Sequence, residues 1–343
     1  MRLPRFRRIS GRLGALIIAF VWLVTISILH AYLNSEPKEA NTVTMGYMPV
    51  VTNLAAPLVD FASKGTAVHF QAIKFASFAE MAEAFKSGHI QVAFIIAPLA
   101  IVLHQQKVPL KVVYIGNRHE STLVVRNDLP YSTLSGMVGR TIAVPIRYSG
   151  HLLALNRYLR EHGLAPESIR TVEIPPSDMA SALRMGGIDG YFVGEPFAGI
   201  AIQAGIGRRL LNVEDIWQEF ICNVVIVRDE LILAHPEWVQ TLVTASVRSC
   251  FYAREHIEEA GEIVGRYWSQ QPEVVSFAFS NPPGRIRFDL YVPVLEELEQ
   301  IAMEMQEAGL LEGRIDLQGI LEPGFALSAD TKPATSLRDI MPK

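Results

Sequence analysis

Residues 178–208 read DMASALRMGGIDGYFVGEPFAGIAIQAGIGR, and this stretch decides the fold class. Its first part has the spacing of an amphipathic helix, expected at Ser177–Met185 and closed by a glycine turn at Gly186-Gly187. The run Asp189–Val193 then predicts a buried strand that leads into a helix at Glu195-Pro196. Helix, strand and helix in this order are typical of a parallel sheet with crossover helices.

The same alternation continues on both sides of that stretch. Short apolar runs that end in turn residues predict strands at 43–51, 68–73, 90–96, 110–115, 121–126, 141–146, 170–173, 210–211 and 222–228. Helical periodicity between them predicts helices at 54–62, 78–87, from 98 onward and at 150–162. The pattern therefore predicts an α/β fold with two α/β units.

The pattern changes after residue 228. Long helices are expected at 235–254, 258–269 and 288–308, and the polar, Pro-rich tail 321–343 is expected to be loosely held. A chain of 343 residues is long enough for two lobes. The predicted division is a signal or anchor helix with a linker at 1–41, one lobe at 42–120 plus 228–325, a second lobe at 121–227, and a tail at 326–343.

The N-terminus has the features of an export segment. Leu13–Leu29 is a run of seventeen residues without charge, and arginines precede it, whereas the first acidic residue is Glu36. Extended by Ala31, Tyr32 and Leu33, this run just spans a bilayer, so we expect an uncleaved transmembrane anchor or a cleaved signal peptide; a core helix is the remaining alternative. For either export segment, the body lies outside the cytoplasm. No cysteine follows closely, which excludes a lipoprotein anchor.

Charge and cysteine content exclude several classes of function. The formal net charge is −4 and five arginines lie ahead of Glu36, so the rest of the chain is acidic and nucleic-acid binding is not expected. Cys222 and Cys250 form no C-x-x-C motif and no Cys/His cluster in the sequence, which excludes zinc-ribbon and iron–sulfur frameworks. We predict no metal and no cofactor. No G-x-S-x-G, H-E-x-x-H or P-loop motif is present, so no catalytic residue is assigned.

Four strand-to-helix corners are the candidate binding site. Ligands of open α/β sheets bind at the carboxyl ends of strands, where helix N-termini offer free N–H groups. The corners are PVVTN at 49–53, Ala97-Pro98, YSGH at 148–151 and GEPF at 194–197. Each has a structural alternative. The polar residues are also ordinary caps, the prolines favoured first-turn residues, Tyr47 a packing residue, His151 a solvated first-turn residue, and Glu195 a partner of the helix dipole. The adjacent His119 and Glu120 are expected in a solvated hinge.

Four stretches carry a resemblance to a known family: GYMPVVTNLAAPLV at 46–59, FAEMAEAFKSGHIQVAFIIAPLAI at 78–101, TLSGMVGRTIAVP at 133–145 and, most specifically, residues 178–208. They resemble periplasmic solute-binding proteins of nitrate/sulfonate/taurine-type ABC importers. The resemblance implies a type II periplasmic-binding-protein fold, in which two lobes close on a ligand, with crossings near Glu120–Val125 and Cys222–Val227. With Tyr47 added from the same strand end, the implied ligand-binding residues are Tyr47, Thr52, Asn53, Ala97, Pro98, Ser149, His151 and Glu195.

The expected function is the extracytoplasmic solute-binding component of an ABC importer, not an enzyme. The solute is expected to be small and polar, of the nitrate, sulfonate, taurine, bicarbonate or pyrimidine-precursor class. Expected partners are an ABC permease and its ATPase, with membrane attachment through the N-terminal helix if it is uncleaved, and the protein is expected to be a monomer. Two alternatives are a membrane-tethered ligand sensor or adaptor with the same fold, and an extracytoplasmic enzyme in which Glu195 and His151 perform acid–base chemistry.

Overall fold

The computed structural model describes residues 11–34 and 41–342, and the chain forms two units that are considered separately. The first unit contains α1 (Gly11–Asn34), which covers the predicted apolar run. Within these described ranges, no helix is long and apolar enough to cross a membrane, so the predicted transmembrane helix is not supported. Residues 1–10 and 35–40, which carry most of the predicted basic segment and linker, lie outside the described residues.

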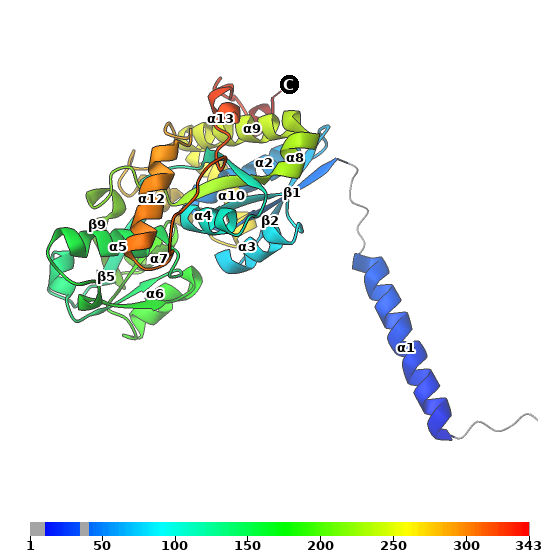
Figure 1. Cartoon of the computed structure of the whole chain (residues 1–343), viewed down its shortest axis with the longest axis horizontal. Helices are drawn as coiled ribbons and strands as arrows, with labels where there is room; N and C mark the ends of the chain where they lie inside the picture. Colours follow the sequence, from blue (N-terminus) through cyan, green and yellow to red (C-terminus); the bar gives the residue numbers. More distant parts are fainter. Residues whose placement is uncertain (1–10, 35–40, 343) are drawn as a thin grey trace, which may run out of the picture. The chain divides into compact units, whose positions relative to one another are not determined.

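The second unit contains two five-stranded sheets among the described residues (Figure 1). The first sheet has the order β2-β1-β3-β10-β4. Its strands are β1 (Thr42–Tyr47), β2 (His69–Lys74), β3 (Val92–Ile96), β4 (Leu110–Ile115) and β10 (Asn223–Arg228). The second sheet has the order β7-β6-β8-β5-β9. Its strands are β5 (Ser121–Arg126), β6 (Thr141–Val144), β7 (Arg170–Glu173), β8 (Gly190–Gly194) and β9 (Gly207–Asn212). Each predicted strand is confirmed, and β9 is longer than predicted.

The direction of the strands shows where the chain passes between the sheets. β1 pairs parallel with β3, and β6 pairs parallel with both β7 and β8. In contrast, β10 and β5 run antiparallel to their neighbours. Because β5 follows β4 and β10 follows β9 in the chain, these two strands receive the chain after each crossing, where the resemblance implied the crossings. The predicted second lobe runs to residue 227, whereas β10, which begins at residue 223, pairs within the first sheet. The division into lobes stays a prediction.

Helices follow the strands as the alternating pattern predicted. The helices that lie between strands are α2 (Ala55–Ser63), α3 (Phe78–Lys86), α4 (Ala97–Gln105), α5 (Gly150–Glu161), α6 (Pro176–Arg184) and α7 (Phe197–Gln203). The C-terminal helices are α8 (Asp229–Ala234), α9 (Pro236–Glu255), α10 (Ile257–Trp268), α11 (Pro272–Ser280), α12 (Leu295–Glu307) and α13 (Gly324–Leu327). Short 3-10 turns are η1 (Val51–Asn53), η2 (Leu134–Met137), η3 (Pro166–Ser168), η4 (Val213–Asp215) and η5 (Leu337–Ile340).

The helix predicted at 288–308 begins later, at Leu295, and its first seven positions are not helical. The backbone before it is used for pairing with the end of the first sheet, since Ile115 N donates to the Tyr291 carbonyl over 2.9 Å. Pro293 also disfavours helical geometry in the residue before it. The completed α12 packs against both α4 and α5 (Figure 1), so it contacts helices that belong to different sheets.

The expectation of a loosely held tail is wrong. The last turn, η5, packs on α2 and α9, and Leu337 and Ile340 are buried there. Arg248 of α9 holds the tail further upstream, because its Nε donates to the Asp330 carbonyl over 2.9 Å. A few apolar residues in a polar segment are enough to fix it when they fill a groove between two helices.

Candidate functional site

Backbone hydrogen bonds join the first predicted corner to the fourth, and join the second to Cys222 at the start of β10. Val51 N, in the first corner, donates to the Glu195 carbonyl in the fourth over 2.8 Å. Ala97 N, in the second corner, donates to the Cys222 carbonyl over 2.9 Å. Because Val51 follows a strand of the first sheet and Glu195 follows a strand of the second, the bond between them connects the two lobes directly.

The corner at 49–53 is fixed by buried side-chain amides. Asn53 is fully buried; its Nδ2 donates to the Met48 carbonyl over 3.1 Å, and its Oδ1 accepts from Asn223 Nδ2 over 2.7 Å. Asn117 Nδ2 donates to the Val51 carbonyl over 3.0 Å. No side chain caps η1 or α2, so helix capping, the structural alternative for Thr52 and Asn53, does not explain either residue.

Three other predicted residues have structural roles. Ser149 caps α5, since its hydroxyl accepts from Leu152 N. Pro98 occupies the first turn of α4, where proline is favoured. Tyr47 is buried and its hydroxyl donates to the Tyr267 carbonyl over 3.2 Å, so this side chain is already satisfied by the protein.

A buried polar network connects the YSGH and GEPF corners through Glu120 and Ser121. Ser121 Oγ donates to Glu120 Oε1 over 2.8 Å, and His151 Nε2 lies 2.9 Å from the same hydroxyl. Glu195 N donates to the other carboxylate oxygen, Glu120 Oε2, over 2.8 Å. Glu120 and His151 are both buried, so the solvated hinge and the solvated first-turn histidine are wrong. The aromatic rings of Phe192 and Phe220 flank the imidazole.

Two glycines are required by this close packing. A Cβ at position 194 would lie 2.4 Å from Glu120 Oε2, and a Cβ at position 116 would lie 2.0 Å from the Thr52 carbonyl oxygen. Both distances are far below van der Waals contact, so Gly194 and Gly116 allow the backbone to approach the network and the first corner. The glycine of the GEPF corner is therefore required because a side chain at position 194 would collide with the Glu120 carboxylate.

Burial sets the charge states of the network. Desolvation raises the pKa of Glu195 to about 7 and lowers that of His151 to about 3, and it also raises the pKa of Glu120. Arg285 opposes the shift of both carboxyl groups, because its positive charge lowers their pKa values. The guanidinium is itself held by Glu214, with Nε to Oε1 at 2.6 Å. His151 is therefore neutral near pH 7.

Glu195 also stabilises the helix that follows it. Its Oε2 accepts from Gly199 N, in the first turn of α7, over 2.8 Å. This is the dipole-partner role that was the structural alternative for this residue. The backbone carbonyl of the same residue accepts the bond from Val51, so residue 195 also connects the segments that follow the two sheets.

Several buried polar atoms in these corners have no protein partner among the described residues. They are Thr52 Oγ1, Asn117 Oδ1, His151 Nδ1 and Asn223 Oδ1. Buried polar atoms in proteins are normally hydrogen-bonded, so atoms without a protein partner are available to a polar solute or to water. Two of the four, those of Thr52 and His151, belong to residues predicted to bind ligand.

Two adjacent cavities open beside the first corner, with volumes of about 230 and 260 Å³. Both are lined by Met48, Ala76 and Pro176, which belong to both halves of the second unit. The larger is also lined by Lys74 and by Trp268, whose indole Nε1 is buried without a hydrogen-bond partner in the described chain. The lining residues, all within the described ranges, include none of the eight predicted ones.

Sequence reasoning missed Glu120, Asn223, Lys74 and Trp268. Lys74 and Trp268 belong to no sequence motif. They line the cavity from the end of β2 and the end of α10. Only the position of Lys74 at the end of a predicted strand could have indicated it. Glu120 was excluded because its neighbour His119 suggested a solvated pair, although only Glu120 is directed inward.

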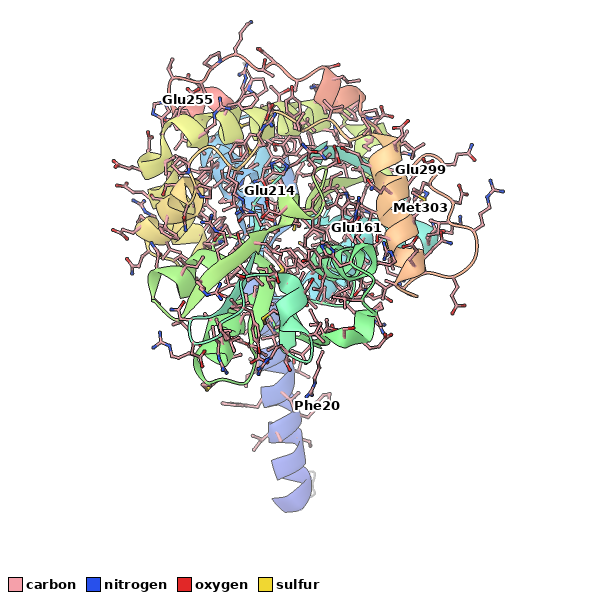
Figure 2. The ribbon with its side chains drawn as sticks, turned by 90° about the vertical axis from the view of Figure 1, so that its left-hand side faces the viewer. Phe20, Glu161, Glu214, Glu255, Glu299 and Met303 are labelled. Carbon is pink, nitrogen blue, oxygen red and sulfur yellow. The ribbon has the colours of Figure 1, made fainter. Side chains whose placement is uncertain are left out.

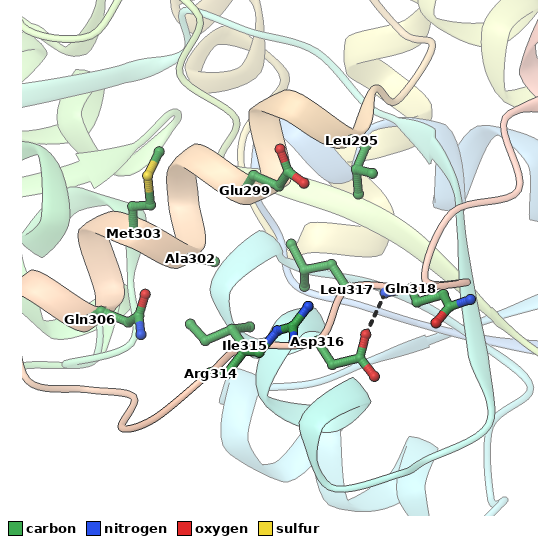
Figure 3. A pocket seen from close by; sticks show the side chains of 10 residues that line it. All are labelled: Leu295, Glu299, Ala302, Met303, Gln306, Arg314, Ile315, Asp316, Leu317 and Gln318. Atoms are coloured by element: carbon green, nitrogen blue, oxygen red, sulfur yellow. Dashed lines mark hydrogen bonds between the residues drawn. The ribbon is translucent and has the colours of Figure 1, made fainter.

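A hollow of about 900 Å³ lies away from the corners, between α12 and residues 314–318 (Figure 3). Glu299 and Met303 line it from α12 and are exposed (Figure 2). None of the network residues lines this hollow, and its volume alone does not make it a binding site.

Known proteins resemble this chain in sequence and in fold. A model of the NMT1-like family matches residues 36–265, more than half of the chain. The bicarbonate transport ATP-binding protein CmpC of Synechocystis is 31% identical over 140 residues, which are 40% of this chain and 21% of that protein. The taurine-binding periplasmic protein of Escherichia coli is 28% identical over 208 residues, or 59% of this chain and 61% of that protein. The chain thus spans less than two thirds of either relative.

A solved structure shows the same fold. The periplasmic nitrate-binding protein NrtA from Synechocystis superposes with a TM-score of 0.73 at 14% sequence identity, covering 84% of this chain and 88% of that one. At this identity the likeness concerns the fold alone. It supports the predicted α/β architecture of two sheets, which the strand orders show independently.

Proposed function

The chain belongs to the NMT1-like family, and from that premise we propose that it is the solute-binding component of an ABC importer of the nitrate/sulfonate/taurine type. In this proposal the protein works outside the cytoplasm, captures a small polar solute between its two lobes, and delivers it to a membrane permease driven by an ATPase. Relatives named for taurine, nitrate and bicarbonate support this class of function.

The observation that carries the proposal is the meeting of corners from both lobes. The Val51–Glu195 backbone bond closes one lobe on the other, and unpartnered buried atoms of Thr52 and His151 lie in the corners that meet there. A hinged protein that buries polar atoms between two lobes gains stability when a solute supplies the missing hydrogen bonds. Such an arrangement binds a solute without catalysing a reaction.

The lining of the larger of the two cavities indicates the kind of solute. Met48, Phe75 and Phe197 offer apolar surface, whereas Lys74 carries a positive charge and Trp268 offers an N–H donor. Lys74 Nζ donates to Ser269 Oγ over 3.0 Å, which holds the ammonium group near this opening. We therefore propose a solute with an anionic or acceptor group and a small apolar part, as in an alkanesulfonate, ahead of a bare inorganic anion.

A melting-temperature panel tests the proposal. The full chain is heated with nitrate, bicarbonate, taurine, alkanesulfonates, aromatic carboxylates and aminopyrimidines, each over a concentration series. A solute present at about 100 times its dissociation constant stabilises the folded protein by about 2.7 kcal/mol, which shifts the melting temperature by several degrees. One solute or one chemical class should give a saturable shift. No saturable shift with any compound would contradict solute capture of this class.

A further inference from the structure

Glu120, His151 and Cys222 come from distant parts of the chain and meet inside the protein. A carboxylate oxygen, a ring nitrogen and the thiol sulfur lie within 4.8 Å of one another, and all three residues are buried. Glu120 directly precedes β5, Cys222 directly precedes β10, and His151 lies in the first turn of α5. This Glu–His–Cys cluster therefore contains one residue from each crossing between the sheets and one from α5.

The three donor atoms are the set that zinc-type ions prefer. Zn²⁺ binds thiolate sulfur, imidazole nitrogen and carboxylate oxygen tetrahedrally, at about 2.0–2.3 Å, so its ligand atoms lie roughly 3.3–3.8 Å apart. A contraction of up to about 1.5 Å therefore brings the three donor atoms to that geometry. A thiolate and a carboxylate together also balance the two positive charges of the ion.

Neighbouring groups already orient the donors. Glu195 N holds Glu120 Oε2, and Ser121 Oγ lies within hydrogen-bond distance of both Glu120 Oε1 and His151 Nε2. In metal sites such second partners fix the direction of the ligands and increase affinity.

A separate observation shows that the cluster is incomplete as a hydrogen-bonded network. His151 Nδ1 is buried and has no partner within the described part of the chain, although the other ring nitrogen contacts Ser121. A buried imidazole normally uses both nitrogens. One ring nitrogen is therefore available to an ion while the other keeps its contact with Ser121.

We propose that Glu120, His151 and Cys222 form a binding site for a divalent ion of the zinc type. On binding, the Cys222 sulfur bonds to the ion and releases its proton to solvent, while Glu120 binds as the carboxylate and His151 as the neutral imidazole. The ion would join both crossings to α5. It would thereby stabilise the region through which the lobes are connected, whether or not a solute is bound.

Cobalt titration of the full-length protein tests this proposal. The protein is stripped with a chelator, its purification tag is removed, and Co²⁺ is added as the spectroscopic probe. We expect one Co²⁺ per chain with a thiolate-to-cobalt charge-transfer band in the near ultraviolet, and displacement of that band by Zn²⁺. Absence of stoichiometric binding, or binding without the charge-transfer band, would overturn the proposal.

Two cysteine variants form a matched pair. Cys222→Ser should abolish the charge-transfer band and weaken binding by about 100-fold or more, since loss of a second partner alone costs about 10–100-fold. Cys250→Ser should keep both, because Cys250 is the other buried cysteine and contacts Tyr114 instead. Retention of the band in Cys222→Ser would contradict the assignment.

A measurement on the unmodified protein covers the case in which Cys222→Ser does not fold. X-ray absorption of the zinc-loaded chain should show one sulfur neighbour together with nitrogen and oxygen neighbours. A shell that contains only nitrogen and oxygen would place the ion elsewhere and overturn the proposal. Neither the cobalt titration nor the X-ray absorption measurement uses a solute. A negative result in either therefore does not affect the melting-temperature test of the proposed function.

Discussion

Replacing Glu195 with glutamine should remove a defined part of the pH dependence of stability. Glu195 is buried, and desolvation raises its pKa from 4.5 to about 7. The folded protein therefore binds more protons than the unfolded chain between these pH values. The linked stability is fully present below pH 4.5 and is lost as the pH rises through about 7. Glutamine has no such titration.

The size of the effect follows from the two pKa values. A change of one in pKa corresponds to about 1.4 kcal/mol, so a rise from 4.5 to about 7 corresponds to about 3 kcal/mol. The charged or titratable groups that act on Glu195 are Glu120, Arg285, Arg209 and Tyr191. All four are present in both proteins, so their own contributions largely cancel when the variant is compared with the wild type.

The assay is urea unfolding of both proteins at several pH values between 4.5 and 8. Glutamine keeps an oxygen that can accept from Gly199 N, so the helix contact is retained. The free energy of unfolding of the wild type should fall by about 3 kcal/mol relative to Glu195→Gln as the pH rises across this range. Glu299→Gln, a change at an exposed position on α12, is the control and should follow the wild type. A constant difference between wild type and Glu195→Gln at every pH would refute the reasoning.

Three further changes test other parts of the account. Gly194→Ala places a methyl group 2.4 Å from a buried carboxylate oxygen and should cost about 1–3 kcal/mol in urea unfolding, whereas Gly187→Ala meets only an ordinary contact at 3.6 Å and should cost far less. Equal effects would show that the close approach is unimportant. Thr52→Val removes a buried oxygen without a protein partner, so calorimetry should show solute affinity reduced about tenfold or more while the melting temperature without solute stays the same or rises. Unchanged affinity would remove this residue from the site. Ile340→Ala should destabilise the chain by about 2–5 kcal/mol because the tail is packed, and the exposed Leu327→Ala should change stability by less than about 0.5 kcal/mol. A small effect at Ile340 would restore the loosely held tail.

The central strands β3, β5, β8 and β10 were predictable because their burial is nearly continuous. β3, for example, is buried at every position, and its short apolar run lies between the polar Gln91 and Ala97-Pro98, where proline marks the start of a helix. The start of α12 was not predictable from periodicity, because residues 287–291 also contain apolar side chains at helical spacing. Their backbone pairs with the end of β4 and the residues that follow it, and that pairing depends on distant residues.

The candidate site was predictable only as far as each corner could be identified by itself. Local chemistry marked Thr52, His151 and Glu195 as strand-end residues, and the structure connects their corners. Their joint partner Glu120 could not be found, because its burial results from folding of both lobes around it. The proximity of Cys222 to His151 and Glu120 was hidden for the same reason, since no local spacing records a contact between two crossings.

Amide hydrogen exchange of the full chain, with and without the solute that raises its melting temperature, tests the central claim most directly. If the solute is held where the corners of the two lobes meet, exchange should slow at residues 50–53 and 195–199 and in the first turns of α4 and α5. These segments come from both lobes and are joined by the network around Glu120. Slowing confined to one lobe, or to the hollow beside α12, would contradict capture between the lobes.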